Sequence, residues 1–124
     1  MKWMIALEQG KIVNVSTSLE IKRLLYMTWR RIRYSAASSL KNAGVYFKSG
    51  SLYSCNRRLM PNCGKYRGNV KNYMNSVAII EHPDGSTYLI SLMSNVLKKN
   101  SANDHYALAS RIDKIVREAT PEKP

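Results

Sequence analysis

Two apolar runs in the second half of the chain predict a β-hairpin. They occupy residues 77–80 and 89–93, and the segment 82–85, His-Pro-Asp-Gly, lies between them. Proline fixes φ and glycine accepts a positive φ, so this segment favours a tight turn. Near-continuous apolar runs are typical of strands covered on both faces. We therefore predict antiparallel strands over residues 73–81 and 86–94.

Residues 45–52 have the alternation of a third strand. On a period of two, one face carries Val45, Phe47, Ser49 and Ser51, and the other carries Tyr46, Lys48 and Leu52. A glycine at position 50 leaves the backbone open to close approach by a ligand or another chain. A lysine beside a serine can bind a carboxylate, one by charge and the other by a hydrogen bond. Lys48-Ser49-Gly50 is thus a candidate anion site, and a strand that ends in a polar turn is the simpler interpretation.

Apolar residues at helical spacing predict two helices before this strand. The first begins at Met1 and ends at Gly10, a suitable C-cap. The second covers residues 17–33, where Thr17 as N-cap and Glu20 three residues later form a capping box. No residue before Met1 is present to cap the first helix, so we expect its opening turns to be missing from this sequence.

A third helix follows the hairpin. Ser101 and Asp104 can cap it, and it ends before Pro121. Its predicted apolar face comprises Leu108, Ile112, Ile115 and Val116. The order helix, helix, three antiparallel strands, helix predicts an α+β domain over residues 1–118 and a tail over 119–124. The last helix can cover one face of the sheet, whereas the two leading helices look too short for the other.

The net charge of +12 changes the picture by its distribution. Between Ile21 and Ile80 there are twelve Lys or Arg residues and no Asp or Glu. Such a stretch is either a solvated basic face or an anion-binding surface. Together with four interleaved tyrosines it supports an alternative function, a small nucleic-acid-binding domain, although no helix-turn-helix, zinc or RNA-recognition motif is visible. The tyrosines are Tyr46, Tyr53, Tyr66 and Tyr73.

Membrane and metal functions find little support in the sequence. No stretch approaches the ~20 apolar residues of a membrane span, and the apolar run at the N-terminus is too short for a signal peptide. Cys55 and Cys63 lie eight residues apart, the wrong spacing for a zinc knuckle, and His82 and His105 are far from them. A disulfide and two free thiols are both compatible with this pattern.

The order of motifs resembles the last third of the serine β-lactamase and penicillin-binding protein family. The shared features are the small-residue loop at 35–42, the Lys48-Ser49-Gly50 strand, the Pro-Asp-Gly hairpin and the closing helix. The resemblance covers residues 1–118 and is greatest to class A β-lactamase-related serine hydrolases. It implies acyl transfer, in which a serine opens a β-lactam or peptide-like amide, without a metal or cofactor.

Carried over by position, the family motif gives each residue a role. Lys48 and Ser49 would bind the substrate carboxylate, and Gly50 would let the substrate lie against the strand. The backbone N–H of Ser51 would be one donor of the oxyanion hole, a group that can contribute ~10²–10³ in rate. The resemblance also implies an exported parent protein, in which Cys55 and Cys63 would form a disulfide.

The chain departs from the family pattern in its other motifs. The Ser-x-x-Lys and Ser-x-Asn motifs should precede residue 1, so we expect a C-terminal fragment that is inactive by itself. The strings at 38–41 and 101–103 have the right spacing but the wrong positions, in a loop and at a helix start. Asn75 stands where class A enzymes often have an arginine, and Lys71 and Arg67 are the candidates to replace that arginine. The acidic deacylation residue has no counterpart.

An incomplete domain should expose a sheet edge. In the family, the edge beside residues 88–93 pairs with strands from the N-terminal part of the domain. An unpaired apolar edge favours association between chains. We therefore expect this chain to self-associate.

Overall fold

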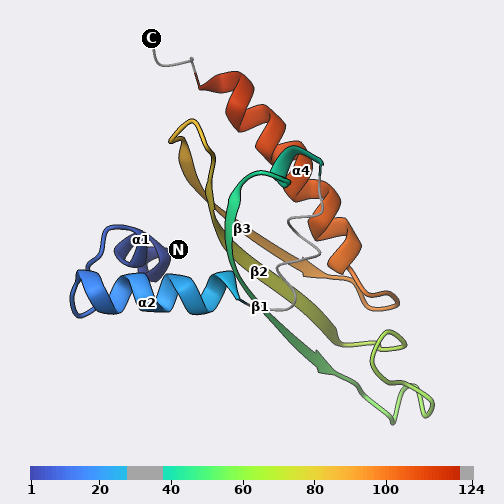
Figure 1. The fold of residues 1–124 in the computed structure, drawn as a ribbon. Coiled ribbons are helices and arrows are strands. Elements are labelled where there is room, and N and C mark those ends of the chain that lie inside the picture. The colour runs from blue at the N-terminus through green and yellow to red at the C-terminus, as the bar shows by residue number, and fades with distance from the viewer. Residues whose placement is uncertain (28–37, 121–124) are drawn as a thin grey trace.

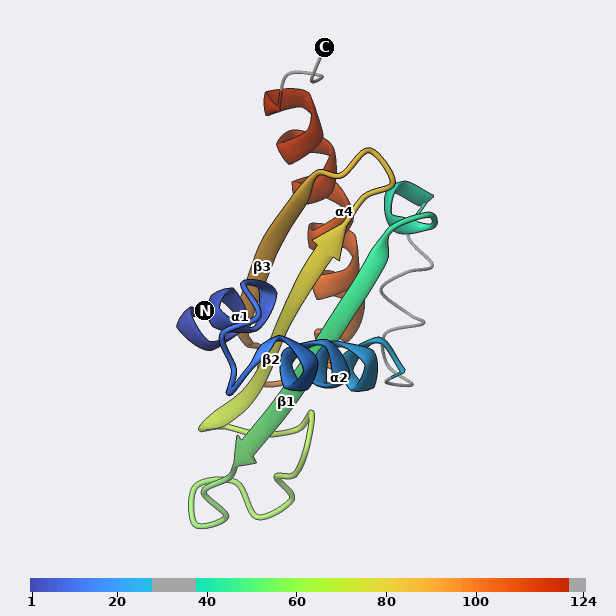
Figure 2. The same cartoon turned by 60° about the vertical axis from the view of Figure 1, so that its left-hand side comes forward.

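The computed structural model describes residues 1–27 and 38–120, which form an α+β fold. The sheet is antiparallel with the strand order β1-β2-β3. Helix α4 lies along one face, and α1 and α2 lie on the other (Figures 1 and 2). The order of the α-helices and strands is the one predicted from the sequence, and a 3₁₀ turn lies within the predicted loop at 35–42. The elements are α1 (Lys2–Glu8), α2 (Val15–Tyr26), the 3₁₀ turn η1 (Ser38–Leu40), β1 (Gly44–Ser54), β2 (Lys71–Glu81), β3 (Thr87–Asn95) and α4 (Ala102–Ala119).

The turn between β2 and β3 forms as its sequence predicts. Gly85 has a φ of 84°, and its N–H donates to the carbonyl of His82 at 2.9 Å. The Asp84 carboxylate accepts from the backbone N–H of Ser86 at 2.8 Å, which closes the turn from the side. These bonds set the register that places Glu81 opposite Thr87 and therefore determine which side chains of β2 and β3 share a face.

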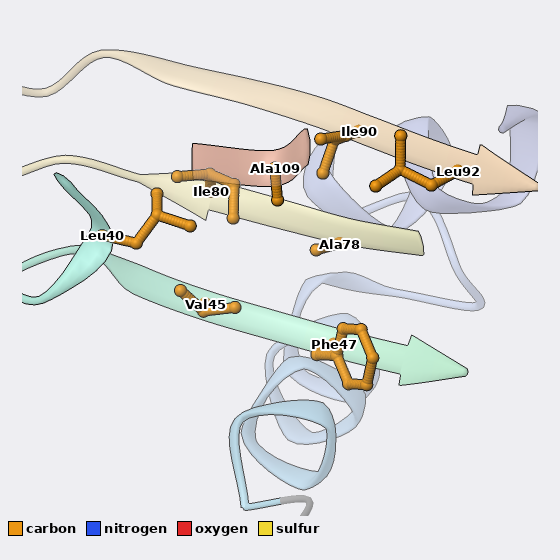
Figure 3. Close-up of a cluster of buried hydrophobic side chains, with 8 residues drawn as sticks. All are labelled: Leu40, Val45, Phe47, Ala78, Ile80, Ile90, Leu92 and Ala109. Atoms are coloured by element: carbon orange, nitrogen blue, oxygen red, sulfur yellow. The ribbon is translucent and has the colours of Figure 1, made fainter. Parts of the chain in front are cut away.

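The face under α4 holds the larger apolar core. Its side chains come from alternate positions of all three strands and interdigitate with residues of η1 and α4 (Figure 3). Removing this apolar surface from water is the main stabilising contribution to this layer. The cluster consists of Leu40, Val45, Phe47, Ala78, Ile80, Ile90, Leu92 and Ala109.

The buried face of α4 differs from the predicted one. Leu108 is 46% exposed and Ile115 is 63% exposed, so their assignment to the core was wrong. The helix instead buries His105, Ala109 and Asp113, which recur at intervals of four residues. Two of these three are polar: His105 has a hydrogen-bond partner on β2, and Asp113 has partners in the β2–β3 turn and on β3. A search for apolar periodicity therefore does not find this face.

The start of α2 also differs from the prediction. The side chain of Asn14, rather than Thr17, caps the helix by accepting the N–H of Thr17 at 2.8 Å. Glu20 does not complete a capping box, because it lies six residues after this N-cap. Its carboxylate instead binds the guanidinium of Arg23 at 2.7 Å. The last predicted residues of this helix, 28–33, lie outside the described part of the chain.

Helices α1 and α2 cover one end of the second sheet face. Met4 and Leu7 are buried against Ile79, and Val77 and Leu89 are half-buried at the edge of this cluster. Gly10, with a φ of 68°, ends the turn after α1 as the sequence predicted. The expectation that these helices are too short to cover the sheet was therefore wrong for this end.

A cluster of polar side chains links the two helices to the strands by ion pairs and a hydrogen bond. The ammonium group of Lys22 on α2 lies 2.9 Å from the Glu8 carboxylate and also binds Glu81 on β2. The hydroxyl of Tyr46 donates to the other oxygen of Glu81 at 2.7 Å. Burial and this hydrogen bond raise the pKa of Tyr46 to about 12, so the tyrosine remains a proton donor to Glu81 throughout the neutral range.

The other end of the same face is bare. Met93 is 79% exposed, and Leu52 and Tyr73 are exposed as well. All three lie on the α1–α2 face by strand alternation, beyond the reach of the helix cluster. An exposed apolar surface of this kind favours association between chains.

We expect the chain to bind ANS and to self-associate through this bare end. Met93→Ser should lower the ANS fluorescence and the oligomer fraction while changing the free energy of unfolding by only about 0.5 kcal/mol. Ile115→Ser is the matched control, because Ile115 is also exposed but lies on α4. ANS titration and analytical ultracentrifugation measure both effects. A monomeric wild-type chain without ANS signal would contradict this prediction.

Candidate functional site

Lys48, Ser49, Gly50 and Ser51 lie in the second half of β1. This strand is at the edge of the sheet, so among the described residues only β2 pairs with it. Lys48, Gly50 and Ser51 are exposed, and Ser49 is half-buried. The segment is thus accessible from the free side of the strand, where an extended ligand can approach the backbone.

The side chains of Lys48 and Ser49 point to opposite faces of the sheet. Lys48 shares the face of Tyr46, which packs near α2, and Ser49 shares the face of Phe47, which packs under α4. The Lys48 ammonium group nevertheless folds back to the carbonyl of Ser49, at 3.1 Å. A carboxylate bound by both side chains must therefore lie across the strand rather than on one face of the sheet.

The backbone N–H of Ser51 is on the same side of the strand as the Ser49 carbonyl. Amide groups two residues apart in a strand point in the same direction. Because Lys48 Nζ contacts this carbonyl, the cation and the Ser51 N–H lie on one side of the chain. A group with negative charge could contact both.

Gly50 is not required by packing. A Cβ added at this position would meet no atom within 4 Å. The residue paired with Gly50 on β2 is Asn75. The open space beside this glycine is compatible with close approach by a ligand.

Lys71 and Arg67 are not brought beside Asn75. Lys71 is at the start of β2, where it pairs with Ser54. It lies four residues before Asn75, which corresponds to about 13 Å along the strand. Its ammonium group lies 6.0 Å from the ring centroid of Tyr73. Arg67 lies in the loop before β2.

The two imitation motifs lie away from Lys48. The first, at 38–41, begins in η1, which packs under α4 through Leu40, and Ser39 Oγ lies 3.2 Å from Ser110 Oγ. The Lys48 side chain is on the opposite face of the sheet. In the second, Ser101 lies at the start of α4 and its hydroxyl is 2.8 Å from that of Ser94.

A buried histidine forms a polar network that the sequence analysis did not identify. His105 Nδ1 lies 2.9 Å from Ser76 Oγ, and His105 Nε2 lies 2.9 Å from Ser94 Oγ. Ser76 is directly opposite Ser49 in the ladder, on the same face. The network therefore joins α4 to β2 and β3, and its Ser76 is the residue paired with Ser49 of the candidate site. The only sequence signal is the position of His105 four residues before Ala109 on the helix.

The environment of His105 favours its neutral form. Burial lowers the pKa of His105, and the nearby Asp104 carboxylate opposes this shift only in part. A neutral imidazole has one donor and one acceptor nitrogen, so it can satisfy one serine hydroxyl on each side. His105 is thus suited to orienting the Ser76 and Ser94 hydroxyls.

The His105 pKa predicts a loss of stability in mild acid. Below about pH 6.5 the unfolded chain takes up a proton that the native histidine resists, so the free energy of unfolding falls as the pH drops from 7 to 5. Glu81, whose pKa is held low by Lys22 and Tyr46 despite its burial, contributes only below about pH 4.5. Urea denaturation at both pH values should show the decrease, and His105→Gln should reduce it. An unchanged pH dependence in this variant would assign it to other groups.

Cys55 and Cys63 form a disulfide with a Cα–Cα distance of 6.1 Å. The bond closes part of the long connection between β1 and β2. Asn56 and Asn69 bind each other across the same connection, with the Asn69 side chain accepting the Asn56 N–H at 2.9 Å and donating to the Asn56 carbonyl at 3.1 Å. The loop next to the candidate site is thus held at two places.

The comparisons with known proteins give no relative for this chain. No protein-family model, curated protein or solved structure matches it. Within residues 1–27 and 38–120, no group of acidic, histidine or cysteine side chains could hold a metal ion, and no helix has the length and hydrophobicity needed to cross a bilayer.

Proposed function

We propose that this chain is the C-terminal portion of a β-lactamase-like serine hydrolase and carries its carboxylate-binding strand. The observation that supports the proposal is the position of Lys48-Ser49-Gly50. The motif lies on an exposed edge strand, a Pro-Asp-Gly hairpin pairs with it in antiparallel fashion, and a C-terminal helix packs behind the sheet. This is the arrangement of the third motif in class A β-lactamase-related enzymes.

In this proposal the substrate lies along the free side of β1. Lys48 supplies the positive charge for its carboxylate, and the Ser49 hydroxyl adds a hydrogen bond from the other side of the strand. Gly50 leaves room for the substrate, and the Ser51 N–H donates to the carbonyl oxygen that gains charge in the transition state. His105 has a supporting role, because it orients Ser76 opposite Ser49.

The proposed activity also needs a nucleophile and a base. The serine of such a site must be activated by a neighbouring base, and neither the string at 38–41 nor that at 101–103 is beside Lys48. The 124 residues therefore supply substrate binding and one oxyanion donor. The nucleophile of the working enzyme is expected from residues outside this sequence.

Nitrocefin turnover and labelling by a fluorescent penicillin test this assignment. The purified 124-residue chain should show neither turnover nor covalent label. Ser38→Ala and Lys41→Ala are the informative variants, because they remove the Ser-x-x-Lys string at 38–41. Turnover by the wild-type chain that is lost in Ser38→Ala would overturn the assignment of the nucleophile to another segment.

A further inference from the structure

A protruding basic surface lies at the end of the sheet opposite the Pro-Asp-Gly turn. The connection between β1 and β2 extends past the strand ends, away from α1, α2 and α4 (Figure 1). The β3–α4 turn lies against it, since the Gly68 N–H donates to the Leu97 carbonyl at 3.3 Å. We call this surface the basic tip, defined by the exposed cations Arg57, Arg58, Lys65, Arg67, Lys71 and Lys98.

The basic tip is held in one shape. The Cys55–Cys63 disulfide and the paired Asn56 and Asn69 amides close its base, as described above. A further backbone pair joins Gly64 and Arg67, with the Arg67 N–H donating at 2.9 Å. A loop ordered in this way loses little conformational freedom when it binds a partner.

The positive charge of the tip is not neutralised by nearby carboxylates. The sequence from 22 to 80 contains no Asp or Glu. Within the described ranges, none of the ion pairs involves a cation of the basic tip, and the neighbouring Asp104 binds Lys99 at 2.8 Å. Asp84 pairs with Arg117 of α4, but it lies in the turn at the opposite end of β2. The tip therefore has a concentrated positive field that favours an anionic partner.

Apolar side chains are exposed among these cations. Leu59 directly follows Arg57 and Arg58 and is 79% exposed, and Val70 is exposed beside Lys71. An exposed leucine side chain makes no favourable interaction with the phosphates of a nucleic acid. Its apolar surface is removed from water when it enters the boundary between lipid headgroups and acyl chains. The neighbouring cations can then remain at the lipid phosphates.

We propose that the basic tip docks on the surface of an anionic lipid bilayer. Its arginines and lysines would bind lipid phosphates while Leu59 enters the headgroup region. The disulfide favours a membrane over a nucleic acid as the partner, because disulfides persist in oxidising compartments outside the cytosol. Of the tyrosines near the tip, Tyr66 is half-buried, with Lys65 5.3 Å from its ring centroid, whereas Tyr53 and Tyr73 are exposed at the adjoining strand ends.

Co-sedimentation of the full 124-residue chain with vesicles tests this proposal. Binding is expected to phosphatidylcholine vesicles with about one third phosphatidylglycerol, and not to pure phosphatidylcholine. It should weaken as NaCl is raised from about 50 to 300 mM. Each cation at the surface contributes about fivefold in affinity, so Arg57→Gln/Arg58→Gln should weaken binding roughly 25-fold.

Matched variants separate the tip from the overall charge. Arg111→Gln/Lys114→Gln removes the same charge from exposed positions on α4 and should leave vesicle affinity within about twofold, since screened charges act locally. Leu59→Ser should weaken binding, whereas Ile115→Ser, at a similarly exposed leucine-sized side chain on α4, should not. Urea denaturation of each variant verifies that the fold is kept.

Three results would overturn the proposal. The first is the absence of binding to the anionic vesicles. The second is an equal loss in the two double-charge variants, which would assign binding to the net charge of the molecule. The third is tighter binding to a single-stranded oligonucleotide that depends on Arg57 and Arg58 but not on Leu59, which would make nucleic acid the partner.

Discussion

Asp113→Ala is expected to lower the free energy of unfolding by about 3–5 kcal/mol, the usual cost of removing one partner from a buried polar pair. The Asp113 side chain is completely buried on α4, and one of its oxygens lies 2.7 Å from both His82 Nε2 and the Tyr88 hydroxyl. Without the carboxylate, a buried imidazole nitrogen and a phenol lose their acceptor at once. Helix α4 would also lose its buried attachment to the Pro-Asp-Gly end of the hairpin, leaving the exposed Asp84–Arg117 pair.

Two further variants define this effect. Asp113→Asn retains the size and one acceptor oxygen, so it should cost less than Asp113→Ala. Glu118→Ala removes an exposed carboxylate from the same helix and should change the free energy of unfolding by only about 0.5 kcal/mol. Urea denaturation monitored by circular dichroism gives all three values. A cost for Asp113→Ala no greater than that of Glu118→Ala would show that the His82–Asp113–Tyr88 contact does not hold α4 on the sheet.

Leu7→Ala is expected to cost about 2–5 kcal/mol, because it empties a fully buried site between α1 and the sheet. Leu7 packs with Met4 against Ile79, which is itself fully buried. Leu19→Ala is the control, since Leu19 is an exposed leucine on α2. If both leucines cost the same small amount, the leading helices would not cover this face in solution.

The strands and the hairpin were predictable because their determinants are local. Proline and glycine at positions 83 and 85 fix the turn, and the apolar runs beside them give strands close to the observed β2 and β3. The added residues at the strand ends depend on a tertiary contact. Asn95 accepts the backbone N–H of Asn72 at 2.9 Å and extends the pairing beyond the apolar run.

The buried face of α4 was not predictable from apolar periodicity. His105 and Asp113 have polar side chains that such a search assigns to solvent, yet each is buried with a hydrogen-bond partner on the β2–β3 hairpin. Their partners, Ser76 and His82, are about thirty residues away in sequence. Only the three-dimensional structure brings these groups together.

The candidate site was predictable in its residues but not in its surroundings. Strand alternation correctly places Lys48 and Ser49 on opposite faces. That β1 is an edge strand, that Ser76 faces Ser49, and that His105 holds Ser76 depend on strand order and register. None of these follows from local sequence.

Binding of a β-lactam carboxylate to β1 is the most direct measurement of the central proposal. Benzylpenicillin titrated into the ¹⁵N-labelled chain should shift the amide resonances of Lys48, Ser49, Gly50 and Ser51, with weak affinity because only part of a site is present. Lys48→Ala should abolish these shifts, and Lys41→Ala, which removes an exposed cation outside β1, should retain them. Shifts that leave β1 unaffected, or that persist unchanged in Lys48→Ala, would contradict the assignment of this strand as a carboxylate-binding site.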